Sequence, residues 1–379
     1  MTSRLRLADI LRSALAALIL PVLFVPMLPA QTTQPSTPEG PIHTLHVYMD
    51  LIQIPVLVLD SEMELMKPID TSRFRISLDA GPVFHPRTVR PEGDDPISLA
   101  ILLNANAEPA LMPQISEAIS SLAPGSLHPA DHISVYGLDC SLTRSLLNVP
   151  ANPVLLKEAV DRALAKWTER HQTRHARPCS QKLQLWDAMG YLVKQLREVP
   201  GRRVMLVVSD GSDHGSIATW SDIRTFTQEA GVAVFGYSTP NVRNSPYRIG
   251  PAITDGHAYR SSGLLPRFRP DNTPEDPFNL ICQLSGGIVL AADERFVPKD
   301  LTRFIALVRS RYIVEFARAR NDTPGQHSIL VTIDKNSIAY IRPAGVIITM
   351  RDAAIDADPS TIPRDATDAP ELGKRKPVH

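Results

Sequence analysis

Residues 203–211 read Arg-Val-Met-Leu-Val-Val-Ser-Asp-Gly, a short apolar run that ends in polar residues. A strand that is buried on both faces of a sheet has this kind of continuous apolar run. Two further runs share the character, at 98–103 and 232–237. Together they predict a parallel sheet that is covered by helices on both sides.

Segments with helical spacing lie between these runs. Apolar residues recur at helical spacing around 115–122, and Asn152 is placed to cap the next helix. Further helices are predicted at 185–196, 221–230, 278–284 and 300–308, and further strands at 131–139 and 287–291. Strands that alternate with helices are typical of right-handed crossovers. We therefore predict a doubly wound, mostly parallel α/β domain over residues 95–310.

Both flanks of this domain have the period of β-strands. Strand-like segments occur at 44–48, 54–58 and 73–78, and again at 312–316, 328–333 and 338–341. Their predicted inward faces are Leu45, Val47 and Met49 before the domain, and Ile329, Val331 and Ile333 after it. An isolated small sheet cannot cover its own apolar face. We predict one Ig-like β-subdomain in which residues 311–350 pair with residues 44–92; the alternative is that each flank separately extends the central sheet.

The first thirty residues have the pattern of a secretory signal peptide. Basic residues precede an apolar stretch at 13–29, which contains Pro21 and Pro26 and is shorter than the ~20 residues of a membrane span. We expect cleavage near Gln31, a linker at 31–43, no stable membrane insertion afterwards, and a periplasmic or secreted protein. An uncleaved membrane anchor is the alternative.

Composition narrows the range of partners. Lys and Arg together number 40, as do Asp and Glu, so the formal net charge is zero. Binding to nucleic acid depends on a basic surface, so we expect no nucleic-acid partner. The tail at 351–379 is polar and rich in Pro and Asp, which predicts disorder.

Polar residues follow two of the buried strands, at the edge where ligands bind in open α/β sheets. They are Asn104-Ala105-Asn106-Ala107-Glu108 and Ser209-Asp210-Gly211-Ser212-Asp213. With Leu183-Gln184-Leu185-Trp186-Asp187-Ala188, Gly201-Arg202-Arg203-Val204, Leu284-Ser285-Gly286-Gly287 and Ser310-Arg311-Tyr312, they resemble the motifs of von Willebrand factor type A (VWA) domains. The likeness extends to the VWA-related secreted proteins of acidobacteria and covers about residues 45–345.

The resemblance implies a metal-ion-dependent adhesion site (MIDAS), at which hydroxyl and carboxylate oxygens bind Mg²⁺. This chain departs from it at four of five positions, because Asn104, Asn106, Glu108 and Leu183 replace the family's ligands and only Asp210 is retained. We expect a vestigial site with no metal and no other cofactor. A Mg²⁺ ion held by Asp210, Glu108 and amide oxygens is the alternative.

Other signals of chemistry are weaker. His171 and His175 have the spacing of a helical zinc site, but the glutamate of a zinc hydrolase is missing. The segment Gly236-Tyr237-Ser238-Thr239-Pro240 lacks the final glycine of a nucleophile elbow.

We therefore expect a secreted, non-enzymatic interaction domain that binds a protein or cell-surface polymer. The loops at 104–113, 140–152, 170–183 and 211–220 would form its binding face. The side chains expected there are Asn104, Asn106, Glu108, Asp210, Ser212 and Asp213. An extracytoplasmic hydrolase that uses Asp210, Asp213, His214 and Glu108 is the alternative.

Cysteine usage adds one further expectation. The chain has three cysteines, Cys140, Cys179 and Cys282. The VWA arrangement places Cys140 and Cys179 at the same edge of the sheet, where their Cα atoms could approach the ~5.5 Å of a disulfide. We predict that these two are bridged; two free thiols are the alternative.

Overall fold

The computed structural model describes most of the chain from residue 51 onward. The described residues are 51–60, 63–173, 184–213, 215–239, 274, 276–319, 324–334, 340–344, 346–348 and 373. The expected signal peptide, the linker and the first predicted strand, with Leu45, Val47 and Met49, precede residue 51 and lie outside the described residues. His175, Cys179, Leu183 and His214 lie outside them too. In the part that is described, no helix is both long and apolar enough to cross a membrane.

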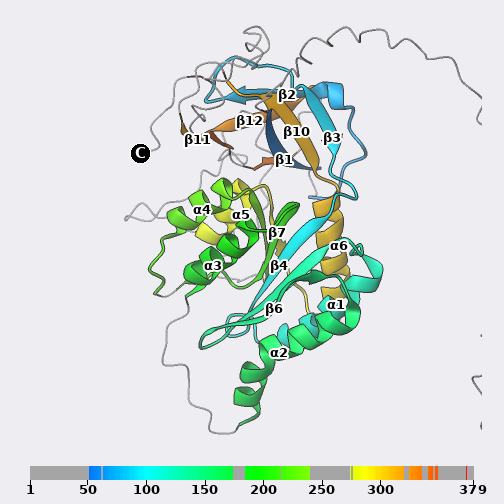
Figure 1. Ribbon diagram of the computed structural model, residues 1–379, viewed down its shortest axis with the longest axis vertical. Coiled ribbons are helices and arrows are strands. Elements are labelled where there is room, and N and C mark those ends of the chain that lie inside the picture. Colours follow the sequence, from blue (N-terminus) through cyan, green and yellow to red (C-terminus); the bar gives the residue numbers. More distant parts are fainter. Residues whose placement is uncertain are drawn as a thin grey trace, which may run out of the picture. The chain divides into compact units, whose positions relative to one another are not determined.

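A six-stranded sheet forms the centre of the α/β region (Figure 1). Its strands lie in the order β6 (Leu142–Pro150), β5 (His132–Leu138), β4 (Ile97–Asn104), β7 (Arg202–Val208), β8 (Val232–Ser238) and β9 (Val289–Ala291). All neighbouring pairs are parallel except β5 and β6. The prediction of a doubly wound, mostly parallel sheet is confirmed.

Two layers of helices cover the sheet. One face packs against α1 (Met112–Gly125), α2 (Pro153–Gln172) and α6 (Val297–Arg309). The other packs against α3 (Leu185–Arg197), α4 (Trp220–Glu229) and α5 (Pro277–Leu284). Asn152 caps α2 as predicted, because its side chain accepts hydrogen bonds from the N–H groups of Val154 and Leu155.

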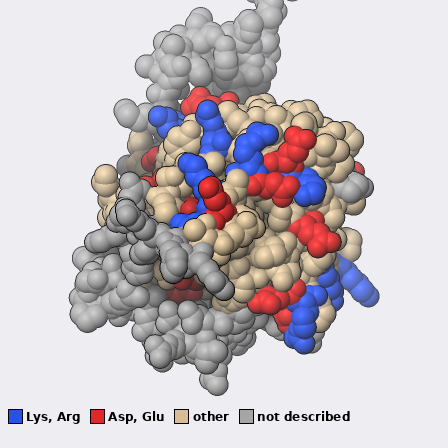
Figure 2. Space-filling view, turned by 90° about the horizontal axis from the view of Figure 1, so that it is seen from below, with Lys and Arg blue, Asp and Glu red and all other residues tan. Residues whose placement is uncertain are grey.

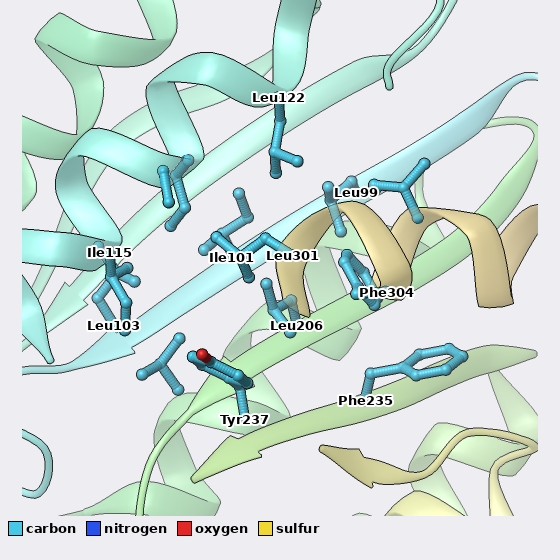
Figure 3. Packing of buried hydrophobic residues seen from close by; sticks show 14 of the residues in the cluster. Leu99, Ile101, Leu103, Ile115, Leu122, Leu206, Phe235, Tyr237, Leu301 and Phe304 are labelled. Carbon is cyan, nitrogen blue, oxygen red and sulfur yellow. The ribbon is translucent and has the colours of Figure 1, made fainter. Parts of the chain in front are cut away.

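Strand β4 shows why a continuous apolar run was a reliable signal. All eight of its residues are buried. Leu99, Ile101 and Leu103 contribute to the core beneath α1, α2 and α6, whereas Ala100 and Leu102 contribute to the core on the opposite face. Figure 3 shows the first of these cores, where side chains of β4, β7 and β8 meet those of α1 and α6. Each such large aliphatic side chain contributes about 1.5–3 kcal/mol through burial.

The segment at 140–152 was predicted to be a loop, and the structure corrects this prediction. Most of it is strand β6, which pairs antiparallel with β5 at the edge of the sheet. None of its residues is buried, so it lacks the apolar run of the central strands. An edge strand that is half exposed needs no such run. Residues 142–150 are therefore an edge strand and not a loop, and their place in the binding face stays a prediction.

The flanking segments form antiparallel β-structure. From the first flank come β1 (Leu51–Leu59), a short 3-10 turn at Thr71–Arg73, β2 (Phe74–Leu78) and β3 (Thr88–Pro91). From the second come β10 (Tyr312–Ala317), β11 (Gly325–His327), β12 (Ile329–Ile333), β13 (Tyr340–Pro343) and β14 (Val346–Ile348). One sheet has the order β13-β1-β10-β3, and β12 pairs with β2 and β11 with β14.

Strands from both flanks share one apolar core. Ile54 lies opposite Val314 across the β1–β10 pair, and Ile76 lies opposite Val331 across the β2–β12 pair. All four residues belong to the same buried cluster. Of the tail at 351–379 only Gly373 is described, and its N–H donates to the Leu78 carbonyl at 3.0 Å. Whether this β-region folds as a subdomain of its own stays a prediction.

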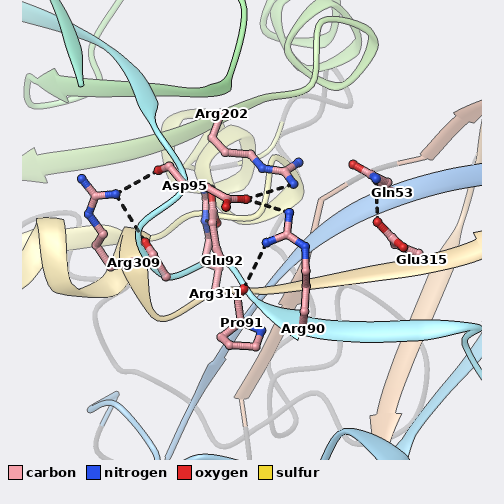
Figure 4. Close-up of polar contacts among 10 residues, drawn as sticks. Gln53, Arg90, Pro91, Glu92, Asp95, Arg202, Arg309, Arg311 and Glu315 are labelled. Atoms are coloured by element: carbon pink, nitrogen blue, oxygen red, sulfur yellow. Dashed lines mark hydrogen bonds and ion pairs between the residues drawn. The ribbon is translucent and has the colours of Figure 1, made fainter. Parts of the chain in front are cut away.

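A fully buried ion pair lies where α6 leads into β10. Arg311 Nε donates to Glu92 Oε2 at 2.6 Å, and Arg311 Nη2 donates to Glu92 Oε1 at 2.8 Å. The two side chains are only 2% and 1% exposed. This bidentate pair joins the end of β3 to the start of β10 (Figure 4).

Further ion pairs surround the start of β4, at what we call the amino edge of the central sheet. Asp95 pairs with Arg90 at 2.7 Å and with Arg202 at 3.5 Å. Asp131, whose side chain is fully buried, pairs with Arg309 and accepts a hydrogen bond from the Ile97 N–H. Asp95 and Asp131 are therefore each paired with an arginine, and Figure 4 shows Asp95 with Arg90 and Arg202.

Candidate functional site

The strand order reverses between β4 and β7, because β4 leads through α1 to β5 on one side and β7 leads through α4 to β8 on the other. Ligands of doubly wound sheets bind outside the carboxyl ends of the strands at such a point. Asn104 ends β4 and Ser209 directly follows β7. We call this side, with the loops that leave β4 and β7, the carboxyl edge.

Asn104 and Ser209 form the floor of this site. The Asn104 Nδ2 donates to Ser209 Oγ at 3.1 Å, and the Gly211 N–H donates to the same oxygen at 3.2 Å. Both side chains are fully buried. Among the described residues, Asn104 Oδ1 accepts no hydrogen bond. The floor thus contains one acceptor without a donor.

Gly211 explains the Ser-Asp-Gly sequence after β7. Its φ of +76° lies in the left-handed region, and a Cβ at this position would lie 2.7 Å from Phe278 Cβ. Glycine avoids both the backbone strain and the clash. The turn therefore places Asp210 outward, on the exposed surface.

Glu108 is tied to the end of β8. Its Oε1 accepts hydrogen bonds from Ser238 Oγ at 3.0 Å and from the Thr239 N–H at 2.8 Å, and its Oε2 accepts one from Thr239 Oγ1. Burial raises the pKa of Glu108, and the nearby negative charge of Asp210 raises it further, while these hydrogen bonds act in the opposite direction. Both carboxylate oxygens serve a contact inside the protein.

Asn106 is held by an arginine side chain. Arg170, at the end of α2, donates to Asn106 Oδ1 at 2.9 Å and also pairs with Asp139 at the end of β5. A guanidinium therefore lies beside the loop that would contribute ligands to a metal. This contact, between residues 64 positions apart, was not predicted from the sequence.

Two aspartates fix the loop after β7. Asp213 accepts hydrogen bonds from the Trp186 N–H at 3.2 Å and from Ser216 Oγ at 2.6 Å. Asp187 accepts hydrogen bonds from the N–H groups of Ile217 and Ala218 at 3.0 and 2.9 Å. Asp187 lay in the matched motif but was not among the expected site residues.

The result is a restrained loop with an exposed apolar tip. We call residues 209–219, apart from His214, the Ile217 loop. The side chain of Ile217 is 94% exposed although its backbone is held by Asp187. Ser212, in the same loop, donates its N–H to Asp210 Oδ1 at 2.9 Å.

The described residues do not bring together the side chains of the hydrolase alternative. Glu108 and Asp213 use their carboxylates for internal hydrogen bonds, Asp210 is exposed at the surface, and His214 is outside the described residues. No group of three or more His, Cys, Asp or Glu in the described part is placed to hold a metal ion. The His171 ring packs on Trp167, with the ring centres 4.4 Å apart.

A small pocket adjoins the site between the end of β5 and the start of α3. Its volume is about 160 Å³, and its lining includes Asp139, Cys140, Asp187 and Tyr191. Cys140 is disulfide-bonded and Cys282 is a buried free thiol. The third cysteine of the sequence, Cys179, lies outside the described residues, so its pairing with Cys140 stays a proposal.

One face of the molecule carries charges of both signs. Figure 2 looks at the protein from below the orientation of Figure 1 and shows basic and acidic side chains interspersed among the coloured residues. No broad basic area is visible on that face. Its appearance agrees with the net charge of zero.

No family model matches the chain, and no curated protein is similar to it in sequence. Solved structures are similar to it in fold. A von Willebrand factor type A structure from Catenulispora acidiphila is 12% identical over 79% of this chain and 62% of that one, with a TM-score of 0.39. Proximal thread matrix protein 1 (PTMP1) from the mussel byssus is 9% identical over 58% of this chain and 49% of that one, with a TM-score of 0.37. An aerotolerance-related membrane protein from Bacteroides fragilis NCTC 9343 is 15% identical over 55% of this chain and 98% of that one, with a TM-score of 0.33.

The match spans less than two thirds of the first two of these structures. Another PTMP1 structure has a zinc-occupied MIDAS motif. In this chain the six-stranded, mostly parallel sheet with helices on both faces has the doubly wound α/β architecture that the resemblance implies. The resemblance to VWA domains is therefore confirmed for the fold.

Proposed function

We propose that this chain is a non-enzymatic, VWA-like interaction domain that binds a protein or cell-surface polymer at its carboxyl edge without a metal ion. The observation that carries the proposal is the Ile217 loop. An apolar side chain that is 94% exposed on a restrained backbone is suited to insert into a partner. Little conformational entropy would be lost on binding, because the loop is already ordered.

The use of the carboxylates favours binding over hydrolysis. A general acid or base must offer its oxygen to a substrate. Glu108 and Asp213 instead accept hydrogen bonds from Thr239, Trp186 and Ser216. These contacts restrain loops, which is a function that a binding surface requires.

The same contacts argue against a MIDAS ion. Mg²⁺ prefers six oxygen ligands in near-ideal octahedral geometry. Asn106 is engaged by Arg170, and Glu108 is directed toward the end of β8. Asp210 is the one exposed carboxylate among the expected ligand positions in the described chain. Millimolar Mg²⁺ or Mn²⁺ should therefore leave the melting temperature unchanged.

We also propose that the protein acts outside the cytoplasm. Disulfides persist in oxidising compartments, and Cys140 is disulfide-bonded. The signal-peptide pattern of the first thirty residues supports the same location. Amino-terminal sequencing of the protein recovered from a producing cell should begin near Gln31.

The test of binding compares two surface substitutions. The mature chain is used as bait on the secreted and surface fraction of its own cells, and the captured partner is identified and titrated. Ile217→Asp should weaken binding of the partner by about tenfold or more, because a charge would replace the apolar tip. Val83→Asp is the matched control, since Val83 is 65% exposed but lies in the β-region. Equal binding by both variants would contradict the proposal.

A further inference from the structure

Four carboxylates at the carboxyl edge have no Lys or Arg partner among the described residues, unlike Asp139 at the end of β5, which pairs with Arg170. Among the described residues, Glu108, Asp187, Asp210 and Asp213 form no ion pair with Lys or Arg; their oxygens accept hydrogen bonds from backbone N–H and hydroxyl groups. A backbone amide satisfies an oxygen but does not neutralise its charge. Among the described residues, the negative charge of these four carboxylates is therefore not neutralised by an ion pair.

The floor of the site adds a second, independent observation. Asn104 is fully buried, yet its Oδ1 accepts no hydrogen bond from any described residue. A buried acceptor without a donor is rare in folded proteins and calls for an explanation. Its Nδ2 donates to Ser209, so the amide is oriented, and its buried oxygen is left without a donor among the described residues. A ligand that completes this site must bring hydrogen-bond donors.

The relation between Glu108 and Asp210 points to the charge of that ligand. Asp210 is exposed, and its negative charge acts on the buried carboxylate of Glu108. A positive group placed on Asp210 would offset this repulsion. An acidic group would increase it unless a metal ion lay between them, and the described residues do not assemble the ligands of such an ion.

We propose that a basic side chain of the protein partner, a lysine or arginine in an exposed segment, docks directly on Asp210 above Asn104. The inference rests on the proposed function and names the partner's chemistry. Such side chains have only donors and no acceptor, which matches a site made of Asp210 carboxylate and Asn104 amide oxygens. In a MIDAS a cation bridges two acids; here the partner would supply the positive charge itself.

The position of Ile217 makes the expected partner segment more specific. Asp187 holds the Ile217 loop and also lines the neighbouring pocket with Tyr191, which is 38% exposed. Ile217 therefore lies on the same loop as Asp210 and Asp213, and Asp187 holds that loop. A segment that combines a basic residue with a neighbouring apolar residue would satisfy both features.

The first experiment uses synthetic probes and the full mature chain. Fluorescence anisotropy in EDTA would measure binding of a short labelled peptide of alternating Lys and Leu, and of the same peptide with Glu in place of Lys. The Lys peptide should bind, and Asp210→Asn should weaken it about fivefold or more. Asp94→Asn is the matched control, because the Asp94 side chain is 87% exposed at the amino edge. Equal weakening by both variants, or stronger binding of the Glu peptide when Mg²⁺ is added, would overturn the proposal.

The second experiment separates this inference from the function it rests on. The partner captured with the native chain is titrated against Asp210→Asn and Ile217→Asp. We expect both substitutions to weaken binding of the partner. We also expect added salt to weaken binding by the native chain more than binding by Asp210→Asn. If only Ile217→Asp weakens binding of the partner, the proposed function stands and the proposal of a basic side chain is wrong. If Ile217→Asp binds like the native chain, the proposed function itself fails.

Discussion

The two edges of the central sheet use acidic residues in opposite ways. At the amino edge Glu92, Asp95 and Asp131 are each paired with an arginine. At the carboxyl edge the described donors to Asp187 and Asp213 are backbone N–H and hydroxyl groups. The pairs at the amino edge join parts of the fold, whereas the carboxylates of Asp187 and Asp213 hold a loop without a charged partner among the described residues. Under the proposed function, the first edge serves stability and the second binds the partner.

The pKa directions follow the same division. Although burial raises the pKa of Asp95, hydrogen bonding to Arg90 and the charges of Arg90 and Arg202 outweigh it, and the net pKa is lowered. The pKa of Glu108 is raised, first by burial and further by Asp210. Arg90 and Arg202 therefore stabilise the ionised form of Asp95, whereas burial opposes the ionised form of Glu108.

The largest effect should come from breaking the pair at the amino edge. Arg311→Met leaves the Glu92 carboxylate buried without a cation, so the free energy of unfolding should fall by about 3–5 kcal/mol. Arg90→Met is the control, because its partner Asp95 is 35% exposed and the loss should stay below about 1 kcal/mol. Urea denaturation measures both. Similar losses of unfolding free energy in the two variants would contradict the larger contribution expected of the buried pair.

The next largest effect on stability should come from the disulfide of Cys140. If Cys140 is bonded to Cys179, closing that loop stabilises the fold by about 4 kcal/mol on the chain-entropy model. Peptide mapping without reductant should recover the two cysteines in one linked fragment, and reduction should lower the urea midpoint. A Cys140 peptide linked to another chain, or found free, would end the proposed pairing.

A smaller effect should follow from releasing the Ile217 loop. Asp187→Ala removes the acceptor of the Ile217 and Ala218 N–H groups, which should cost about 1–2 kcal/mol. Hydrogen exchange at these two amides should become faster. Asp161→Ala is the control, because Asp161 forms an exposed pair with Lys157 on α2. Unchanged exchange in Asp187→Ala would mean that the loop is held by other contacts.

The smallest effect concerns pH. Because the folded pKa of Glu108 is raised, its contribution to stability is fully present below the unfolded pKa and is lost as the pH rises through the folded pKa. Asp210→Asn removes one cause of the shift, so the pKa of Glu108 should fall and stability at neutral pH should rise by less than about 1 kcal/mol. Carboxyl NMR titration measures this. An unchanged pKa would show that the two carboxylates do not interact.

The sequence was most informative where burial was complete. Strands β4, β7 and β8 were predicted because both of their faces are covered, which requires an unbroken apolar run. Strands β6 and β3 have no buried residue and were missed for that reason. Secondary structure at an exposed edge is set by pairing with a neighbour, which no local pattern records.

The candidate site was predicted in position but not in its contacts. The polar residues after β4 and β7 do lie at the switch point of the sheet. The bonds of Glu108 to Ser238 and Thr239 span about 130 positions of sequence, and those of Arg170 to Asn106 span 64. Such contacts depend on the folded arrangement of the loops. Asp187 carried a local signal, since it opens α3 in the first turn, where acidic residues are favoured.

The most direct test of the account is hydrogen exchange of the mature chain with and without its captured partner, in the presence of EDTA. With the partner bound, we expect slower exchange in the loops after β4 and β7, including Ile217 and Ala218, and no change around Glu92 and Asp95. Protection at the amino edge, or loss of all binding in EDTA, would contradict the claim that the carboxyl edge binds a partner without metal.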